Sequence, residues 1–136
     1  MENNCLFCDK KNVEEDCFFE NEYFYVILSH QPISEGHSVI IPKKHYEYLH
    51  EIPSEIILNI MMNLEKVLEK MKKAVNFESY NIAINNGELS GMQIKHVHIH
   101  IIPRFKGDKI HIERNKEFFV FTDEIKNSLR KKLIDI

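Results

Sequence analysis

The spacing of apolar residues predicts several short strands and one long helix. Residues 17–28 are rich in aromatic and β-branched types, and we interpret them as two strands joined by a turn at Asn21-Glu22. Residues 37–41 form the next expected strand, which Pro42 ends, and residues 79–85 alternate polar and apolar side chains as a further strand does. This pattern favours a mostly antiparallel sheet.

A helical pattern lies between the strands at 37–41 and 79–85. Apolar residues recur from Ile56 to Met71 at intervals of three and four, which gathers them on one face of a helix, and Ser54 is the expected N-cap. Residues 117–121 suggest a short strand, and Thr122 or Asp123 is the expected cap of a last helix. We predict a single α+β domain over residues 1–136, with about five strands against one long helix.

The most informative segment is residues 96–100, where three histidines alternate with Val97 and Ile99. Successive side chains of a strand point to opposite faces, so His96, His98 and His100 are expected on one face. Neighbouring histidines of this row lie about 6.5–7 Å apart and the outer two about 13 Å apart. One metal ion can therefore take two of them but hardly all three, and at least one needs a second role.

Composition narrows the class of protein. The chain is 43% hydrophobic and 29% charged with a net charge of −3, which argues against nucleic acid as its main partner. No apolar run approaches the roughly 20 residues that cross a bilayer, so no membrane partner is expected. The first residues lack a basic start and an apolar segment, so no signal peptide is expected. Three cysteines, an odd number, argue against a disulfide framework and favour a reducing, cytoplasmic compartment.

The pair Cys5-Leu6-Phe7-Cys8 is a second constellation. Two thiolates at this spacing suit one tetrahedral Zn²⁺, although a lone pair of this kind is also typical of a redox site. Two more ligands must come from elsewhere, and His45 and His96 are the expected ones. A closed site of two cysteines and two histidines is structural, because no position remains for a catalytic water.

The run from His96 to Ile102 resembles the His-φ-His-φ-His-φ-φ signature of the histidine triad (HIT) family, in which φ is an apolar residue. Further pieces stand at the family's spacing, and the resemblance is closest to bacterial zinc-bearing members. These pieces are Cys5-Leu6-Phe7-Cys8, residues 36–45, Asn85-Asn86-Gly87, Gly91 and Ile102-Pro103-Arg104. The resemblance covers residues 5–108 and leaves residues 109–136 as a C-terminal extension.

The resemblance implies a homodimer that binds a purine nucleotide in a cleft on the sheet. His98 is then the nucleophile that attacks the α-phosphorus and forms a nucleotidyl-histidine intermediate. His100 hydrogen-bonds the phosphate oxygens, and His37 is the fourth histidine of the site. The implied substrate is a nucleoside phosphoramidate, an acyl-nucleotide or a dinucleoside polyphosphate. In the zinc-bearing members the metal is held by the equivalents of Cys5, Cys8, His45 and His96.

This chemistry is physically reasonable. A neutral imidazole is a good nucleophile near neutral pH, and a labile phosphorus–nitrogen bond divides one hard displacement into two easier ones. A backbone carbonyl is the expected acceptor for the proton on the other ring nitrogen of His98. The loop over residues 86–91 is expected to aim backbone N–H groups at the phosphate. No acidic cluster suggests a catalytic Mg²⁺ site.

Two positions depart from the family pattern. Ser29 stands where the family has an acidic or amide residue that contacts the ribose, and Gln93 stands where a hydroxyl helps the leaving group. We expect the specificity of this chain to lie at Met92 and Gln93. The resemblance also assigns Asn85 and Gly91 to the nucleotide. The expected substrate-binding residues are Ser29, Asn85, Gly91, Gln93, Ile94, His98 and His100.

Two other functions stay open on the sequence. The departures at Ser29 and Gln93 suit a zinc-stabilised nucleotide-binding module that senses its ligand with little catalysis. A third hypothesis is a small β-barrel oxygenase with iron at His98 and His100. The long helix and the lack of a nearby carboxylate argue against that hypothesis.

Overall fold

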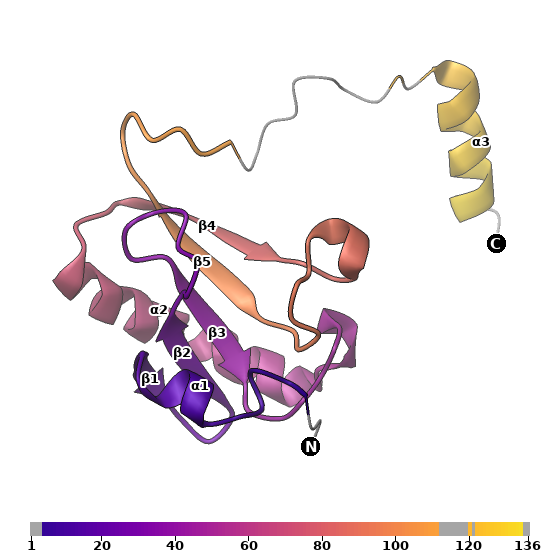
Figure 1. The fold of residues 1–136 in the computed structure, drawn as a ribbon. Coiled ribbons are helices and arrows are strands. Elements are labelled where there is room, and N and C mark those ends of the chain that lie inside the picture. The colour runs from indigo at the N-terminus through magenta and orange to yellow at the C-terminus, as the bar shows by residue number, and fades with distance from the viewer. Residues whose placement is uncertain (1–3, 112–119, 121, 135–136) are drawn as a thin grey trace.

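The computed structural model describes residues 4–111, 120 and 122–134. Its centre is one five-stranded sheet in the order β1-β2-β3-β5-β4 (Figure 1), and every pair of neighbouring strands is antiparallel. The predicted α+β class is confirmed. The strands are β1 (Cys17–Glu20), β2 (Phe24–Leu28), β3 (Ser38–Pro42), β4 (Ser79–Ile84) and β5 (Ile99–Arg104). The α-helices are α1 (Lys11–Glu14), α2 (Ser54–Ala74) and α3 (Asp123–Ile134), and two short 3₁₀ helices span Leu49–Glu51 and Glu88–Ser90.

The central strands read as continuous apolar runs because both of their faces are buried. Along β2, Phe24 and Val26 belong to one apolar cluster, whereas Tyr25 and Ile27 belong to a second cluster on the opposite face. The second cluster includes Val13 of α1, so the N-terminal segment covers part of that face. A strand buried on both sides loses the polar half of its alternation.

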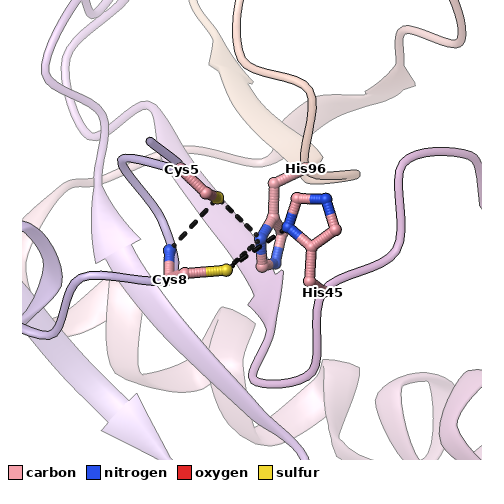
Figure 2. A group of neighbouring side chains, drawn as sticks. All are labelled: Cys5, Cys8, His45 and His96. Carbon is pink, nitrogen blue, oxygen red and sulfur yellow. Dashed lines mark hydrogen bonds between the residues drawn. The ribbon is translucent and has the colours of Figure 1, made fainter. Parts of the chain in front are cut away.

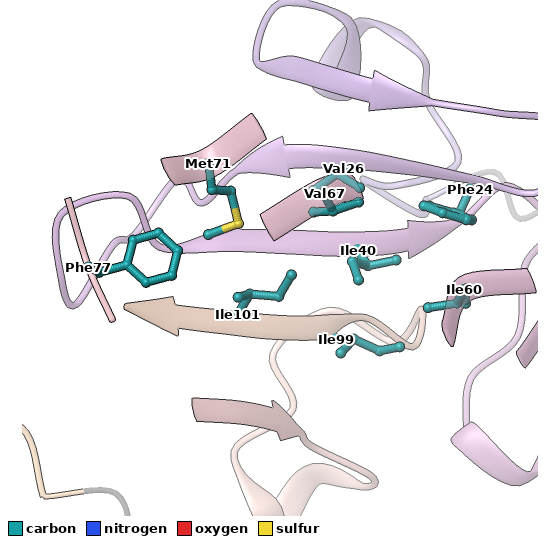
Figure 3. Packing of buried hydrophobic residues seen from close by; sticks show 9 residues of the cluster. All are labelled: Phe24, Val26, Ile40, Ile60, Val67, Met71, Phe77, Ile99 and Ile101. Atoms are coloured by element: carbon teal, nitrogen blue, oxygen red, sulfur yellow. The ribbon is translucent and has the colours of Figure 1, made fainter. Parts of the chain in front are cut away.

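Helix α2 covers the first face of the sheet (Figure 3). Its buried residues Ile60, Val67 and Met71 recur at helical spacing and pack against Ile99 and Ile101 of β5. Burying one such side chain stabilises a fold by roughly 1.5–3 kcal/mol. Because Ile99 and Ile101 point to α2, the alternate residues of β5 point to the opposite face.

The start of α2 corrects the prediction. Ser54 is the first helical residue rather than the N-cap, and Pro53 occupies the cap position without a side-chain hydrogen bond. The amide hydrogens of Ile56 and Ile57 are donated to the carbonyl oxygen of Pro53, at 3.0 and 3.2 Å. A backbone acceptor therefore replaces the hydroxyl that was expected to begin the helix.

Strand β5 begins at Ile99, so the first three residues of the histidine run precede the strand that was expected to contain them. The partner strand β3 ends at Pro42, which has no amide hydrogen to continue the ladder. The carbonyl oxygen of Pro42 accepts instead from Nε2 of His96, at 2.8 Å. The amide hydrogen of Val97 is donated to the carbonyl oxygen of Tyr46, at 2.7 Å. Bonds to residues 42–46 thus replace strand pairing here.

The C-terminal helix α3 begins as predicted. The hydroxyl oxygen of Thr122 accepts from the amide hydrogen of Ile125 at 3.2 Å and caps the helix, none of whose described residues is buried. Residues 117–119 and 121 of the expected short strand lie outside the described residues. Among the helices that the structure describes, none has the length and apolarity needed to cross a membrane.

Candidate active site and metal centre

A pocket of about 670 Å³ opens on the face of the sheet opposite α2, where Ile27 and Val39 form part of its floor. Small-molecule sites typically measure roughly 300–1,000 Å³. The structure brings together residues that are far apart in the sequence. All the catalytic and substrate-binding residues expected from the sequence line this pocket: Ser29, His37, Asn85, Gly91, Gln93, Ile94, His98 and His100.

A hydrogen bond determines which ring nitrogen of His98 carries the proton. Its Nδ1 atom lies 2.7 Å from the carbonyl oxygen of His96, and a carbonyl oxygen only accepts, so the proton is on Nδ1. The expectation of a backbone acceptor is therefore confirmed. Burial lowers the pKa of His98, so the neutral ring carries a free lone pair on Nε2.

A chain of hydrogen bonds sets the protons of His37 and His100. The amide hydrogen of Ile33 is donated to Nδ1 of His37 at 3.1 Å, so the neutral ring of His37 carries its proton on Nε2. This Nε2–H is donated to Nδ1 of His100 at 2.9 Å. His100 therefore carries its own proton on Nε2 and offers that N–H as a donor.

Both rings of this chain are held neutral. Burial lowers the pKa of His37, which is 4% exposed. Burial, followed by repulsion from His98 and His37, lowers the pKa of His100 to about 4. A second proton on His37 would set an N–H against the amide hydrogen of Ile33. Among the described residues that line the pocket, none is Lys, Arg, Asp or Glu.

Two backbone N–H groups of the loop before the histidine run are engaged within the loop itself. Residues 88–90 form a 3₁₀ turn, and the amide hydrogens of Ser90 and Gly91 are donated to the carbonyl oxygens of Gly87 and Glu88, at 3.1 and 3.0 Å. These two N–H groups are therefore committed to the turn rather than aimed at a phosphate. Gly91 has a φ of +99°, which glycine adopts without strain, and this angle ends the turn beside Asn85.

The two departures from the family pattern both lie at the pocket. The hydroxyl oxygen of Ser29 accepts from the amide hydrogen of Gln31 at 3.2 Å, so it already has a local partner. Gln93 lines the pocket and is exposed. Met92, in contrast, is 6% exposed and is not a lining residue. Of the two residues expected to set specificity, only Gln93 reaches the pocket.

A cluster of four metal-ligating side chains lies beside the pocket (Figure 2). Its donor atoms all lie within 4.8 Å of one another. Sγ of Cys5 is 3.3 Å from Nδ1 of His96, and Sγ of Cys8 is 3.3 Å from Nδ1 of His45. A tetrahedral Zn²⁺ places its ligand atoms about 3.3–3.8 Å apart. The four side chains can therefore hold a metal ion, and they are those expected: Cys5, Cys8, His45 and His96.

The surroundings of the cluster also suit a cation. Nε2 of His96 donates to the carbonyl oxygen of Pro42 at 2.8 Å, which leaves Nδ1 as the ligand atom, and burial lowers the pKa of this ring to about 4. Burial and the neighbouring thiol of Cys8 raise the pKa of the Cys5 thiol. Holding the sulfur of Cys5 as a thiolate therefore calls for a positive charge beside it. The geometry favours a metal site over the redox alternative.

Several lining residues were missed by the sequence analysis, Leu6 and Phe7 among them. Leu6 and Phe7, which lie between the two cysteines, form part of the pocket wall. Two apolar residues inside a short cysteine pair were the only available signal, and they pointed equally well to packing. The open sheet with α2 on one face contradicts the β-barrel oxygenase hypothesis.

Comparisons with known proteins find relatives that share one family. The family model named HIT domain matches residues 10–107. An uncharacterised HIT-like protein of Methanocaldococcus jannaschii is 40% identical over 106 residues, which are 76% of this chain and 81% of that protein. The adenosine 5'-monophosphoramidase of Saccharomyces cerevisiae is 36% identical over 102 residues, which are 74% of this chain and only 62% of the yeast protein. The crystal structure of a Zn-bound histidine triad family protein from Mycobacterium smegmatis matches with a TM-score of 0.70 at 28% identity, over 84% of each chain.

Proposed function

Because the chain belongs to the HIT domain family, we propose that it is an enzyme that cleaves or transfers nucleotides at the α-phosphate through an intermediate on His98. The observation that carries this proposal is a pair of neighbouring rings with opposite roles. His98 offers a lone pair on Nε2, His100 offers an N–H on Nε2, and the ring centroids are 4.9 Å apart. One ring suits attack on phosphorus, and the other suits a hydrogen bond to a phosphate oxygen.

The reaction then has two balanced steps. The lone pair of His98 Nε2 forms a bond to the α-phosphorus, and the leaving group departs with the electrons of its bond to phosphorus and takes a proton from solvent. In the second step a water oxygen attacks the same phosphorus and the phosphorus–nitrogen bond breaks. The products are a nucleoside monophosphate and free His98, and the proton of the water passes to solvent.

The charge of the pocket bears on the substrate class. We propose a nucleoside phosphoramidate or an acyl-nucleotide, with a purine base, in preference to a dinucleoside polyphosphate. The proton-donating rings are neutral, and no described lining residue is Lys or Arg. A polyphosphate brings several ionised phosphates that no cation of the described pocket would balance.

We also propose that Cys5, Cys8, His45 and His96 hold Zn²⁺, since two sulfur and two nitrogen donors in tetrahedral reach suit this ion. When bound, the ion supplies a structural cross-link between the N-terminal loop and the segments before β5 and after β3. Two further parts of the proposal are a homodimer and a cytoplasmic location, where the reducing environment keeps the two sulfurs free to bind metal.

The test is a panel of adenosine and guanosine phosphoramidates, acyl-nucleotides and dinucleoside polyphosphates, followed by mass spectrometry of the intermediate trapped on His98. Replacing His98 by Ala is expected to abolish turnover while AMP still binds. His111, which is exposed and outside the pocket, gives the matched control His111→Ala. Full turnover in His98→Ala would contradict the mechanism.

One observation favours a second function, a nucleotide-sensing module with little catalysis. The hydroxyl of Ser29 is engaged by Gln31, so it offers a ribose a weaker contact than a free carboxylate would. Slow turnover across the whole panel beside tight binding of AMP would favour this function. Fast turnover of any one compound would exclude it.

A further inference from the structure

The metal cluster and the pocket share one short segment of chain, residues 5–8. Cys5 and Cys8 point to the ligating histidines, whereas Leu6 and Phe7 line the pocket. The ring of Phe7 packs edge-on against two histidines, with its centroid 5.9 Å from that of His96 and 5.1 Å from that of His98. One aromatic ring thus contacts both a metal ligand and the proposed nucleophile.

We propose that Phe7 is a positioning residue for His98. We also propose that a metal ion bound by the cluster holds Leu6 and Phe7 in place at the nucleotide pocket. The inference rests on the proposed function and extends it to two residues that lie between the metal-ligating cysteines. The metal then affects nucleotide binding and the attacking ring through residues 5–8, without contacting the nucleotide.

Few other bonds of the described residues hold this segment in place. Residues 5–8 belong to no helix or strand. The amide hydrogen of Cys8 is donated to the carbonyl oxygen and to Sγ of Cys5, both at 3.3 Å, and these bonds lie within the segment itself. The side chain of Asn12 donates to the carbonyl oxygen of Leu6 at 2.9 Å. Phe7 also packs in the second apolar cluster, beside Ile27 and Val39. Since thiols are weak hydrogen-bonding groups, metal–sulfur bonds are the strongest polar links available between this segment and the rest of the fold.

The ring of His98 is confined from two sides. Its Nδ1–H is bonded to the carbonyl oxygen of His96, which still permits the ring to tilt about this bond. Phe7 closes one side by a T-shaped contact with an interplanar angle of 79°. Both residues are 8% exposed, so their contact is largely shielded from solvent. A smaller side chain at position 7 would give the His98 ring space to rotate away from the direction in which it attacks phosphorus.

Leu6 faces the pocket from the same segment, but unlike Phe7 it is exposed. It lines the pocket while 55% of its surface stays exposed, so an apolar surface is available to a bound ligand. If the segment loosens, this surface leaves the pocket together with Phe7. Loss of the metal is therefore expected to weaken nucleotide binding as well as to slow the chemical step.

Phe7→Leu tests the positioning role, with Phe19→Leu as a matched control. Phe19 is partly buried against the cluster on the α2 face and stacks on Phe24, away from His98. In the metal-loaded full chain, Phe7→Leu is expected to keep its metal and to slow single-turnover nucleotidylation of His98 on the order of tenfold to a hundredfold. Phe19→Leu is expected to keep both the metal and the rate. A wild-type rate in Phe7→Leu would overturn the positioning role.

Removal of the metal with a chelator tests the wall of the pocket. Calorimetry with AMP is expected to show at least a tenfold weaker affinity for the metal-free chain than for the zinc-loaded chain. The two methyl resonances of Leu6 are expected to shift on AMP addition only when zinc is present. Equal AMP affinity with and without zinc would overturn the inference.

A third measurement separates this inference from the proposed function. Nuclear Overhauser contacts between the rings of Phe7 and His98 need no nucleotide, and they are expected in the zinc-loaded chain and lost on chelation. Contacts that persist in the metal-free chain would overturn the inference. A zinc-loaded chain that shows the contacts but neither binds AMP nor forms the intermediate would instead overturn the proposed function.

Discussion

Nε2 of His37 lies 2.9 Å from Nδ1 of His100, and the direction of this hydrogen bond is set from outside the pair by the amide hydrogen of Ile33. A backbone N–H cannot accept, so it leaves His37 only one neutral form, with the proton on Nε2. His100 is then forced to keep its proton on the other nitrogen. Replacing His37 by Leu is expected to slow nucleotidylation of His98 by about tenfold to a hundredfold, because His100 loses the partner that orients its donor.

The matched variant His37→Gln keeps an amide N–H that can be donated to Nδ1 of His100, and it is expected to recover most of the rate. Nitrogen-15 spectra of the imidazole rings give a readout that a purely structural role would not move. The wild-type chain is expected to show His37 and His100 with the proton on Nε2 and His98 with the proton on Nδ1. A spectrum with the proton of His100 on Nδ1 would contradict the assignment.

The low pKa of His100 predicts how activity depends on pH. Its pKa is lowered to about 4, first by burial and then by His98 and His37, so the neutral ring, whose Nδ1 accepts from His37, is fully present at neutral pH. Protonation of Nδ1 breaks this hydrogen bond, and with it the orientation of the ring, only as the pH falls toward 4. We expect a flat rate of nucleotidylation from about pH 6 to pH 8 and a fall below about pH 5. The pH profile of single turnovers measures this.

The lowered pKa of His100 also predicts how the free energy of unfolding changes with pH. An unfolded histidine titrates near 6.5, so between about pH 6.5 and pH 4 the unfolded chain binds more protons than the folded one, and stability falls as the pH is lowered. Urea unfolding across this range is expected to show the fall in wild type and in the exposed control His111→Ala. A smaller fall is expected in His100→Gln, and an unchanged fall in that variant would contradict the role of this ring.

The metal cluster predicts different outcomes for two cysteines. Cys8→Ser is expected to lose the bound zinc, whereas Cys17→Ser is expected to keep it, since the thiol of Cys17 lies outside the cluster and donates to the carbonyl oxygen of Phe19. Each kcal/mol of stability that the bound ion contributes corresponds to roughly 3 °C in Tm for a domain of this size, so Tm is expected to fall in Cys8→Ser and to change little in Cys17→Ser. Elemental analysis and thermal unfolding measure both effects. Equal zinc content in the two variants would contradict the assignment of the ligands.

Local patterns predicted the features of this fold that depend on neighbouring residues. The apolar period of α2 and the apolar runs of β2 and β3 were sufficient, because each element buries its own periodic face. The sequence analysis placed the start of β5 too early, because this boundary depends on Pro42, which lies in a strand distant in the sequence. Leu6 and Phe7 were missed for a similar reason, since only the folded chain shows that residues 5–8 lie against the pocket.

The functional residues show the same division. The residue types at the pocket were predicted through the family signature, whereas the proton positions on the histidines were only partly predictable. A carbonyl acceptor for His98 was expected from chemistry alone, and His96 supplies it. The donor to His37 is the amide of Ile33, and nothing in a sequence marks which backbone N–H will point at a ring.

The turn that carries His37 gives a last prediction, on stability. Gly36 has a φ of +83°, and a Cβ there would lie 3.0 Å from Cγ2 of Val75, whereas Gly107 has a φ of +81° with nothing within 4 Å of its Cβ position. Gly107→Ala therefore adds backbone strain alone, about 1–2 kcal/mol, and Gly36→Ala adds the steric contact to it, for a total of about 2–4 kcal/mol. Because Gly36 directly precedes His37, its displacement is also expected to slow nucleotidylation, which Gly107→Ala leaves unchanged. Urea unfolding and single turnovers of the two variants measure this, and an equal loss of stability in both would show that Val75 yields without cost.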